Sequence, residues 1–483
     1  MYFPCSAAVL DRFGVFVYNF ILRITQIMGQ INSVKKDKTE LFERMPVASA
    51  IISLAIPTII SQIIHVVYSI ADTFFIGQLN DPNQVAAATL IMPPFLLLAA
   101  ISNLFGIGGA SLISRSLGAG DREKARRCAA FCMWSAGGVA LIYGLVMFLF
   151  RSTIFPLLGS DEYTYGYCTA YALWTLAIGA VPTVLNPCLA HMVRAEGYSK
   201  EASFGVAMGG ILNMALDPLF IFPLGLGVAG AAIATMLSNL VATVYFIILI
   251  MKKRDVMTIR FSPKYYSLKG GVPKEVLLVG LPSCLLMLMS TLSNTILNKL
   301  VVSYSNQTIA GMGIGKKIDT FAFAFTNGMT QGVLPLIGYN YASGDHARMR
   351  KAARLSFLFA FGLAAISAVF LFTCAVPLVK AFIDDAATVA YGQHVLKIIC
   401  VTVPCTSVTM MIITMFQATG QKVKPMLVSL MRKGCLDIPF MFLMDHLYGA
   451  DGIPFATPIA DLLAMIIAAA VFIPYWRKIG KTL

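Results

Sequence analysis

The sequence of 483 residues is poor in charge. Only 12% of its residues are Asp, Glu, Lys or Arg, whereas an average soluble domain has roughly 25%. Hydrophobic residues make up 58% of the chain, and the mean hydropathy is +0.77. A soluble protein of this size could not cover its surface with so few polar groups. The composition therefore excludes soluble enzymes, nucleic-acid-binding proteins and secreted domains, and it indicates a polytopic membrane protein.

Metal-ligand patterns are scarce as well. The chain has five His and ten Cys, and the Cys are spread singly. Cys128 and Cys132 share a helix face, but no His or second Cys pair completes a metal site. We interpret both as small packing residues, and we expect neither a bound metal nor a cofactor.

Enzyme motifs do not appear. The sequence has no phosphate-binding glycine loop and no nucleophile elbow in a fitting context. A membrane-embedded transferase would need a catalytic cluster at one membrane face, whereas four histidines lie on different loops and helix ends: His191, His346, His394 and His446. We predict that the protein is not an enzyme, and that any active transport uses an ion gradient.

Long apolar runs are abundant. A transmembrane helix needs about 20 apolar residues, and twelve such runs begin near residues 47, 84, 124, 164, 201, 227, 272, 308, 347, 387, 425 and 451. The runs are continuous rather than alternating with period two, which argues against an outer-membrane barrel. The predicted fold class is an all-α polytopic membrane protein with twelve transmembrane helices.

The net charge of +14 reports membrane orientation rather than nucleic-acid binding. Most of the 37 Lys and Arg lie on one alternate set of loops and on the C-terminal tail, and the other set holds only Arg151 and Lys380. This positive-inside bias predicts that both termini are cytoplasmic. We expect a multi-pass protein of the bacterial cytoplasmic (inner) membrane, whose partner is the lipid bilayer and not a nucleic acid.

Residues 1–44 form a predicted N-terminal cytoplasmic extension. Residues 1–34 are apolar in patches, but Asp11, Arg12 and Arg23 interrupt them. Because no small-residue cleavage site follows, we reject a signal peptide. Two interpretations stay open. The segment is an interfacial helix, or residues 1–27 lie upstream of the translated protein because Met28 is its true start.

The chain repeats itself with an offset of about 222 residues. Ile56-Pro57 recurs as Leu281-Pro282, Asp72-Thr73 as Asn294-Thr295, Gly120-Asp121 as Gly344-Asp345, and Val181-Pro182 as Val403-Pro404. This pattern predicts two pseudo-symmetric six-helix lobes, at 45–252 and 272–483, joined by a basic cytoplasmic linker at 253–271. Six helices give both lobes the same orientation, and such parallel repeats enclose a central pathway in transporters.

Ionisable side chains inside a membrane cost at least ~2.5 kcal/mol by insertion scales, so each needs a reason. Asp72 lies in the first run, together with His65 and Tyr68, which are candidates for the substrate pathway. Asn213 and Asp217 lie four residues apart on one face of the fifth run. The sequence thus places two carboxylates and an amide in the N-terminal lobe. Local capping or pairing of each Asp is the alternative, and His65 is more simply a satisfied interior histidine.

The C-terminal lobe carries charges of both signs inside the membrane. Its eighth run contains Lys316, Lys317 and Asp319, and its eleventh run contains Arg432, Lys433 and Asp437. Lys433 and Asp437 have the spacing of an ion pair, which favours a structural role over a role in the substrate pathway. We expect this lobe to neutralise its own charges and the acids of the N-terminal lobe to lack a nearby intramembrane base. That asymmetry favours the N-terminal lobe as the cation site.

Three further residues are candidates for movement or for the substrate pathway. Pro57 lies in the middle of the first run and permits a kink, either static or coupled to Asp72. Glu196 ends the fourth run, either as a gate or as a solvated helix end. Asn294 lies in the seventh run, where the repeat places the counterpart of Asp72.

Several short segments together carry a more specific signal. They are Leu54-Ala-Ile-Pro57, Ala71-Asp72-Thr-Phe-Phe-Ile-Gly77, Asp81-Pro82-Asn83, Val85-Ala-Ala-Ala-Thr89, Gly118-Ala-Gly-Asp121, Arg194-Ala-Glu-Gly197, Asn213-x-x-x-Asp217-Pro218 and Gly227-x-x-Gly230. This set resembles the MATE (multidrug and toxic compound extrusion) family, most of all its bacterial MepA-like branch. The likeness extends from about residue 40 to residue 478.

The resemblance implies a secondary active antiporter that exports lipophilic organic cations in exchange for inward H⁺ or Na⁺. In family members a first-helix Asp and a fifth-helix Asn-x-x-x-Asp pair form the cation site, which maps onto Asp72, Asn213 and Asp217. The bend of the first helix maps onto Pro57. We expect a monomer without an obligatory protein partner.

A flippase for lipid-linked oligosaccharides or lipids, built from similar lobes, is the competing function. Such a flippase should line its chamber with several unpaired Arg or Lys for phosphate groups. The acids of the first lobe argue against it. A second cation site in the C-terminal lobe, known from another branch of the family, is doubtful because Asn294 and Asn298 stand where a carboxylate would be sought.

Overall fold

The computed structural model describes residues 38–79 and 81–481, and all regular secondary structure in these ranges is helical. Eight helices in this part of the chain are long and apolar enough to cross a membrane. They are α3 (Val47–Gly77), α4 (Pro82–Gly118), α5 (Arg122–Leu149), α9 (Ser199–Ile221), α10 (Gly227–Lys252), α11 (Val272–Val301), α13 (His346–Thr373) and α19 (Ile453–Lys481). The predictions for residues 1–34 concern a part of the chain outside the described residues.

Two further crossings are bent rather than straight, which the apolar runs alone did not reveal. One joins α7 (Glu162–Ala172) and the π-helical turn η1 (Leu173–Ile178) to α8 (Ala180–Ala195) with a bend of 46°. The other joins α15 (Ala386–Cys400) to α16 (Val403–Ala418) with a bend of 44°. Pro182 and Pro404 lie in the first turn after each break, and a proline has no N–H to continue the preceding helix.

The remaining two predicted crossings contain the intramembrane charges that were predicted for the C-terminal half. One is α12 (Asn306–Ala342). The other is a continuous helical segment made of α17 (Val423–Leu430), the π-helical turn η3 (Met431–Leu436) and α18 (Asp437–Tyr448). By length and apolar composition the described residues contain up to ten membrane spans, and these two charged helical segments account for the difference from the twelve predicted. Short helices complete the fold: α2 (Lys38–Glu43), α6 (Arg151–Leu157), η2 (Pro263–Tyr265), α14 (Ala375–Lys380) and η4 (Gly449–Asp451).

Equivalent helices in the two halves begin with equivalent caps. The side chain of Asp121 accepts the backbone N–H of Lys124 before α5, and that of Asp345 accepts the backbone N–H of Arg348 before α13. Asp161 and Asp385 cap α7 and α15 in the same way. Each carboxylate satisfies an N–H group that the first helical turn leaves without a partner. The order of elements from α3 to α10 therefore recurs from α11 to α19.

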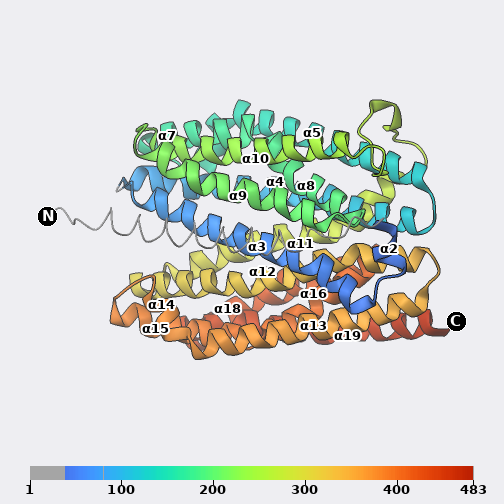
Figure 1. The fold of residues 1–483 in the computed structure, drawn as a ribbon. Coiled ribbons are helices and arrows are strands. Elements are labelled where there is room, and N and C mark those ends of the chain that lie inside the picture. Colours follow the sequence, from blue (N-terminus) through green and yellow to red (C-terminus); the bar gives the residue numbers. More distant parts are fainter. Residues whose placement is uncertain (1–37, 80, 482–483) are drawn as a thin grey trace.

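The helices form two layers, with α3 and α11 running between them (Figure 1). The first helix of each half packs on the second helix of the other half, α3 on α12 and α11 on α4. Glycines permit these close contacts: Gly328 and Gly332 of α12 meet the backbone of α3, and Gly280 of α11 meets the backbone of α4. A Cβ atom at any of these glycines would collide with the facing helix.

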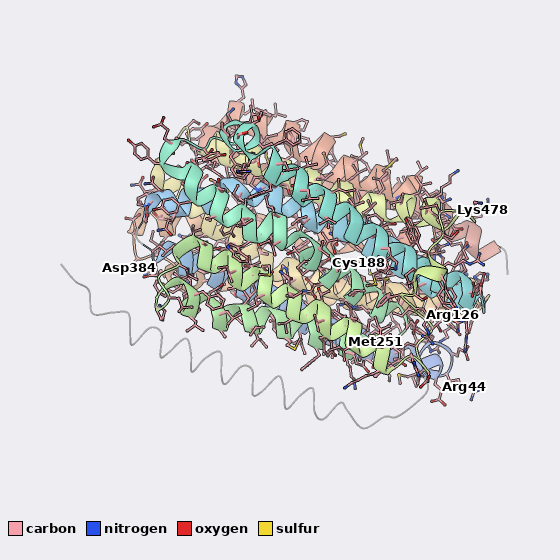
Figure 2. All side chains as sticks on the ribbon, turned by 90° about the horizontal axis from the view of Figure 1, so that it is seen from above. Arg44, Arg126, Cys188, Met251, Asp384 and Lys478 are labelled. Carbon is pink, nitrogen blue, oxygen red and sulfur yellow. The ribbon has the colours of Figure 1, made fainter. Side chains whose placement is uncertain are left out.

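Opposite ends of the bundle differ in charge. Arg44, Arg126 and Lys478 lie at one end and Asp384 lies at the other (Figure 2). We call the first the basic end. There Glu275 of α11 pairs with Lys124 at 2.9 Å and with Arg115 at 3.6 Å, which joins the two halves of the chain.

Candidate functional site

The N-terminal candidate site lies where α3 packs against α9. Gly210 of α9 permits the contact, since a Cβ atom there would lie 3.0 Å from Cδ1 of Tyr68 and 3.3 Å from Cγ2 of Ile64. Asn213 and Asp217 follow Gly210 at helical spacing on the same face of α9, and Asp72 follows Tyr68 by four residues on α3. The glycine thus brings the predicted residues of two helices together.

Asn213 and Asp217 are joined by a hydrogen bond. The Asn213 amide Nδ2 donates to Oδ1 of Asp217 over 3.2 Å and to the hydroxyl of Thr235 on α10 over 3.3 Å. Asp217 is fully buried, and Asp72 lies close enough to interact with it electrostatically. One buried oxygen of each predicted residue has no hydrogen-bond partner: Oδ1 of Asp72, Oδ1 of Asn213 and Oδ2 of Asp217. The site therefore presents unsatisfied acceptor atoms, which are suited to a proton or a hard cation.

Aromatic residues line the same region. The hydroxyl of Tyr68 lies 3.3 Å from Nε2 of His65, and the two rings meet edge to face at 4.8 Å. His65 thus has a local partner, and its side chain is exposed. Tyr171 of α7 is buried and interacts electrostatically with Asp72 and Asp217. Sequence reasoning missed Tyr171 and Thr235, because neither is ionised and nothing in a single sequence aligns α7 or α10 with α3.

Lys317 corrects one sequence expectation. The acids of the N-terminal half were expected to lack an intramembrane base, yet Lys317 of α12 interacts electrostatically with Asp72 of α3. The reason is the packing of α3 on α12, which brings a lysine from the other half of the chain to this site. The C-terminal half therefore does not neutralise all of its own charges, because Lys317 interacts with an acid of the N-terminal half.

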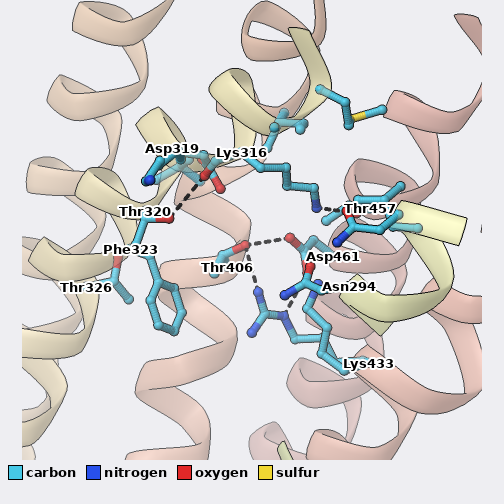
Figure 3. Close-up of a pocket in the computed structure, with 18 residues that line it drawn as sticks. Asn294, Lys316, Asp319, Thr320, Phe323, Thr326, Thr406, Lys433, Thr457 and Asp461 are labelled. Carbon is cyan, nitrogen blue, oxygen red and sulfur yellow. Dashed lines mark hydrogen bonds and ion pairs between the residues drawn. The ribbon is translucent and has the colours of Figure 1, made fainter. Parts of the chain in front are cut away.

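The C-terminal half contains a cavity of about 450 Å³ (Figure 3). Residues of α11, α12, α15, α16, η3 and α19 line it. Asn294, predicted as a pathway residue, lies in its wall together with Asn298. The cavity does not include Asp72, Asn213 or Asp217 in its lining, so the structure separates the candidate residues into two groups.

Two buried ion pairs stabilise the charges around this cavity. Lys433 Nζ lies 2.9 Å from Oδ2 of Asp437, which also accepts a hydrogen bond of 2.7 Å from Ser293. Arg432 Nε lies 2.7 Å from Oδ1 of Asp461. The hydroxyl of Thr406 donates to Oδ2 of the same Asp461 over 2.8 Å (Figure 3). Sequence reasoning overlooked Asp461, although an acid inside the last apolar run was itself a signal.

Glu196 lies apart from both groups, at the basic end after α8. Its carboxylate accepts backbone N–H groups of the linker, from Thr258 at 2.9 Å and from Ile259 at 2.5 Å. Burial raises the pKa of Glu196 to about 7, although these two hydrogen bonds lower it. The carboxylate is 6% exposed and anchors residues 258–259, so it is not the solvated helix end that one interpretation of the sequence offered.

Pro57 lies within α3, which continues on both sides of it. Gly332 and Gly328 of α12 contact α3 at Ala55 and Ile59, two residues before and two after the proline. The hydroxyl of Thr58 donates to the carbonyl of Leu54 over 2.8 Å. The proline therefore occupies the contact between the two halves.

Metal ligation by His, Cys, Asp and Glu alone finds no support in the structure. Within residues 38–79 and 81–481, no three such side chains gather at a distance suited to one metal ion. A cation at the N-terminal site would need the amide and hydroxyl oxygens of Asn213 and Thr235 beside the carboxylates.

The comparisons with known proteins follow the same division into halves. The MatE family model matches residues 57–219 and again residues 282–443. The chain belongs to the MatE family. It is 31% identical over 442 residues to the multidrug export protein MepA of Staphylococcus saprophyticus subsp. saprophyticus, covering 92% of this chain and 96% of that protein. MepA of Staphylococcus aureus is likewise 31% identical over 445 residues, with the same coverage.

Solved MATE structures have the same fold. A crystal structure of MATE in complex with MaL6 superposes with a TM-score of 0.87 at 25% identity, covering 93% of this chain and 100% of that one. A multidrug resistance MATE family transporter of the MOP superfamily, in an outward-facing conformation, superposes with a TM-score of 0.84 at 25% identity and the same coverage. The MatE protein described here is therefore a membrane-spanning transporter, and the predicted family and fold class are confirmed.

Proposed function

We propose that this MatE protein is a secondary active multidrug exporter that moves lipophilic organic cations out of the cell in exchange for inward H⁺ or Na⁺. Relatives with 31% identity are named multidrug export proteins. The single observation that carries the coupling mechanism is the N-terminal site, where Asp72, Asn213 and Asp217 each keep a buried oxygen without a partner.

The coupling ion binds at Asp72 and Asp217. A proton neutralises a buried carboxylate directly, and Na⁺ is coordinated by carboxylate, amide and hydroxyl oxygens, which Asp72, Asn213 and Thr235 offer here. Either ion adds positive charge between two interacting acids. Binding of the ion at this site and binding of a cationic substrate then compete for the same negative charge, which is the basis of exchange.

The ion site is linked to the contact between the halves. Asp72 and Pro57 lie on the same helix, and α12 packs on α3 around the proline. A change of charge at Asp72 alters its interaction with Lys317 of α12. Rocking of the halves about this contact exposes the substrate pathway to alternate sides of the membrane.

In this proposal the protein lies in the bacterial cytoplasmic membrane, with its basic end and both termini in the cytoplasm. The support is the excess of Lys and Arg at that end. The protein functions as a monomer in this proposal, without an obligatory partner chain.

The test is ethidium efflux from drug-sensitive bacteria that express wild type, Asp72→Asn or Asp217→Asn at equal membrane abundance. Wild type should lower cellular ethidium, and both variants should fail to do so. Asp255→Asn is the matched control, since this side chain is 89% exposed on the linker, and it should export like wild type. Export by both site variants would refute the coupling site, and no export by wild type under either an H⁺ or a Na⁺ gradient would refute the exporter.

A flippase for lipid-linked sugars remains the competing function, and the charge pairing of the C-terminal half weighs against it. Arg432 and Lys433 are held by Asp461 and Asp437, so they are not free to bind phosphate groups. Loss of ethidium export together with translocation of a fluorescent lipid-linked phosphate in proteoliposomes would favour the flippase.

A further inference from the structure

The linker between the two halves is fastened to the outer surface of α5. The indole N–H of Trp134 on α5 donates to the backbone carbonyl of Phe261 over 3.0 Å. The ring of Tyr266 stacks on that of Phe131 with the centroids 6.3 Å apart, and its hydroxyl lies 3.4 Å from the hydroxyl of Ser135. The linker therefore lies along the part of α5 that follows the basic first turns of this helix.

Two cations stand beside one aromatic ring of the attached linker. The guanidinium carbon of Arg126 on α5 lies 6.0 Å from the ring centroid of Tyr265, and Nζ of Lys264 lies 5.3 Å from the same centroid. Neither cation forms an ion pair with another described residue. Nε of Arg126 is buried without a hydrogen-bond partner. The ring thus brings together two positive charges for which this part of the chain supplies no acid.

Other cations of the same region are neutralised by the chain itself. Four of them lie 2.6–3.8 Å from a carboxylate oxygen: Lys124, Arg127, Lys253 and Arg254. Arg260 donates to the backbone carbonyls of Met257 and Ile259. Arg126 and Lys264 therefore differ from their neighbours, because an anion from outside the protein could bind them without displacing an acid.

An apolar strip continues from the two cations along α5, away from the basic end. We call the strip formed by Trp134, Gly138, Leu141 and Leu145 the α5 strip; its members follow one another at helical spacing on one face. Trp134, Leu141 and Leu145 are 47%, 48% and 50% exposed. A Cβ atom on Gly138 would have nothing within 4 Å, so the strip has open space between Trp134 and Leu141.

The order of these features matches one phospholipid molecule. The rise of an α-helix puts Trp134 roughly 12 Å from Arg126 along the axis, and tryptophan is typical of the level of the lipid headgroups. Anionic lipids of the cytoplasmic leaflet bind Lys and Arg at the membrane surface. A free inorganic anion or an acidic protein segment could use the cations, but neither would cover the α5 strip.

We propose that Arg126, Lys264 and Tyr265 form a binding site for the headgroup of an anionic phospholipid, whose acyl chain lies on the α5 strip. One cation comes from α5 and the other from the linker, so the bound lipid joins the linker to the N-terminal half. Glu196 holds the same linker from within the protein through residues 258–259. The proposal rests on the proposed membrane orientation and is independent of the exported substrate.

Trp134 reports directly on the lipid that occupies this site. The chain has three Trp, so the background Trp174→Phe/Trp476→Phe leaves Trp134 as the single fluorophore. The purified full chain is reconstituted into vesicles of brominated phosphatidylcholine, which quenches tryptophan fluorescence on contact. Increasing fractions of unbrominated phosphatidylglycerol or unbrominated phosphatidylcholine are then included. Recovery of the fluorescence gives the binding constant of phosphatidylglycerol relative to phosphatidylcholine.

In this background phosphatidylglycerol should bind about fivefold more tightly than phosphatidylcholine, which is the effect of roughly one cation at an anionic membrane surface. Arg126→Gln/Lys264→Gln should lower the relative constant to about one, whereas Arg126→Lys should keep it above about threefold. Equal quenching of all variants in pure brominated phosphatidylcholine shows that they are folded and inserted alike.

Lys351→Gln/Arg354→Gln is the matched control. It removes two exposed cations from α13, the counterpart of α5, which also begins at the basic end. The control should keep the fivefold preference. A relative constant near one in the starting background, or an equal decrease in the control, overturns the lipid site. Ethidium efflux is scored separately, so failure of the proposed export function would leave the measured lipid preference unchanged.

Discussion

Gly332 of α12 lies against the backbone of Ala55 in α3, two residues before Pro57. A Cβ atom on Gly332 would stand 2.7 Å from Cα of Ala55, a distance that real Cβ contacts do not show. The helix α3, which contains both Pro57 and Asp72, is therefore held by direct backbone contact with the other half.

Gly332→Ala should weaken this contact. Overpacking of a close interface costs typically 1–3 kcal/mol, which corresponds to a shift of roughly 5- to 150-fold in the equilibrium between the present arrangement and one in which α3 and α12 separate. The shift is measured as the rate of maleimide labelling of a cysteine introduced in place of Gln62, which in wild type forms a hydrogen bond with Gln331 across the same contact.

Gly362→Ala is the control, because nothing lies within 4 Å of its added Cβ. Unchanged labelling in Gly332→Ala would contradict the role of the contact.

Removing Lys433 should destabilise the protein strongly. Lys433→Met leaves Asp437, which is fully buried, without its cation, and breaking a buried ion pair from one side costs about 3–5 kcal/mol. The double variant Lys433→Met/Asp437→Leu should recover a large part of that loss. Thermal denaturation of the purified protein provides the measurement.

The matched control for this pair is Arg127→Met. Arg127 and Glu123 form an ion pair with the same i,i+4 spacing, but both side chains are about half exposed, and such surface pairs contribute about 0–1 kcal/mol. An equal loss of stability in Lys433→Met and Arg127→Met would show that burial of the C-terminal pair has no consequence.

Glu196 should make the attachment of the linker depend on pH. Its pKa in the folded protein is about 7, above the ordinary value of about 4.3, so Glu196 binds a proton more tightly when the linker is attached than when it is detached and the carboxylate is in water. The stabilisation is fully present below pH ~4.3 and is lost as pH rises through about 7, by at most about 1.4 kcal/mol per pH unit.

Hydrogen exchange at the amides of Thr258 and Ile259, corrected for the intrinsic exchange rate, measures this attachment. Protection should decrease between pH 5 and pH 8 in wild type and should not depend on pH in Glu196→Gln, whose amide stays neutral. A slope of the opposite sign in wild type would show that the two backbone hydrogen bonds outweigh burial.

Thr235 should support coupling without being ionised. Thr235→Val removes the hydroxyl that accepts a hydrogen bond from Asn213, and one such bond contributes about 1 kcal/mol. The concentration of driving ion that gives half-maximal efflux should therefore rise about fivefold. Thr243→Val on the same helix is the control, since Thr243 donates to the carbonyl of Pro182 instead, and its ion dependence should match that of wild type.

The sequence predicted those features that depend on neighbouring residues along the chain, such as helix starts and the spacing of residues on one helix face. Helix starts were predicted within about two residues, because each apolar run begins within the first turn of its helix. The i,i+4 relations of Asn213 with Asp217 and of Lys433 with Asp437 follow from helical spacing alone. The bends before Pro182 and Pro404 were missed, because apolar runs report length and not direction.

Contacts between helices could not be predicted from the periodicity of the sequence. The interaction of Lys317 with Asp72 and the pairing of Arg432 with Asp461 join residues that are distant along the chain. Periodicity fixes which face of a helix is apolar but not which helix it meets. The gathering of Asp72, Asn213 and Asp217 was nevertheless anticipated, because the resemblance to a family supplied the contact that periodicity could not.

The reciprocal packing of α3 on α12 and of α11 on α4 has the arrangement of a two-fold dimer interface, to which both subunits contribute the same surface. In a dimer of identical chains, every substitution would appear on both sides of the axis. Joining the halves through one linker removes that constraint. A carboxylate can then stand at Asp72 while its counterpart in the other half is the amide Asn294, so that the two halves can acquire different binding chemistry.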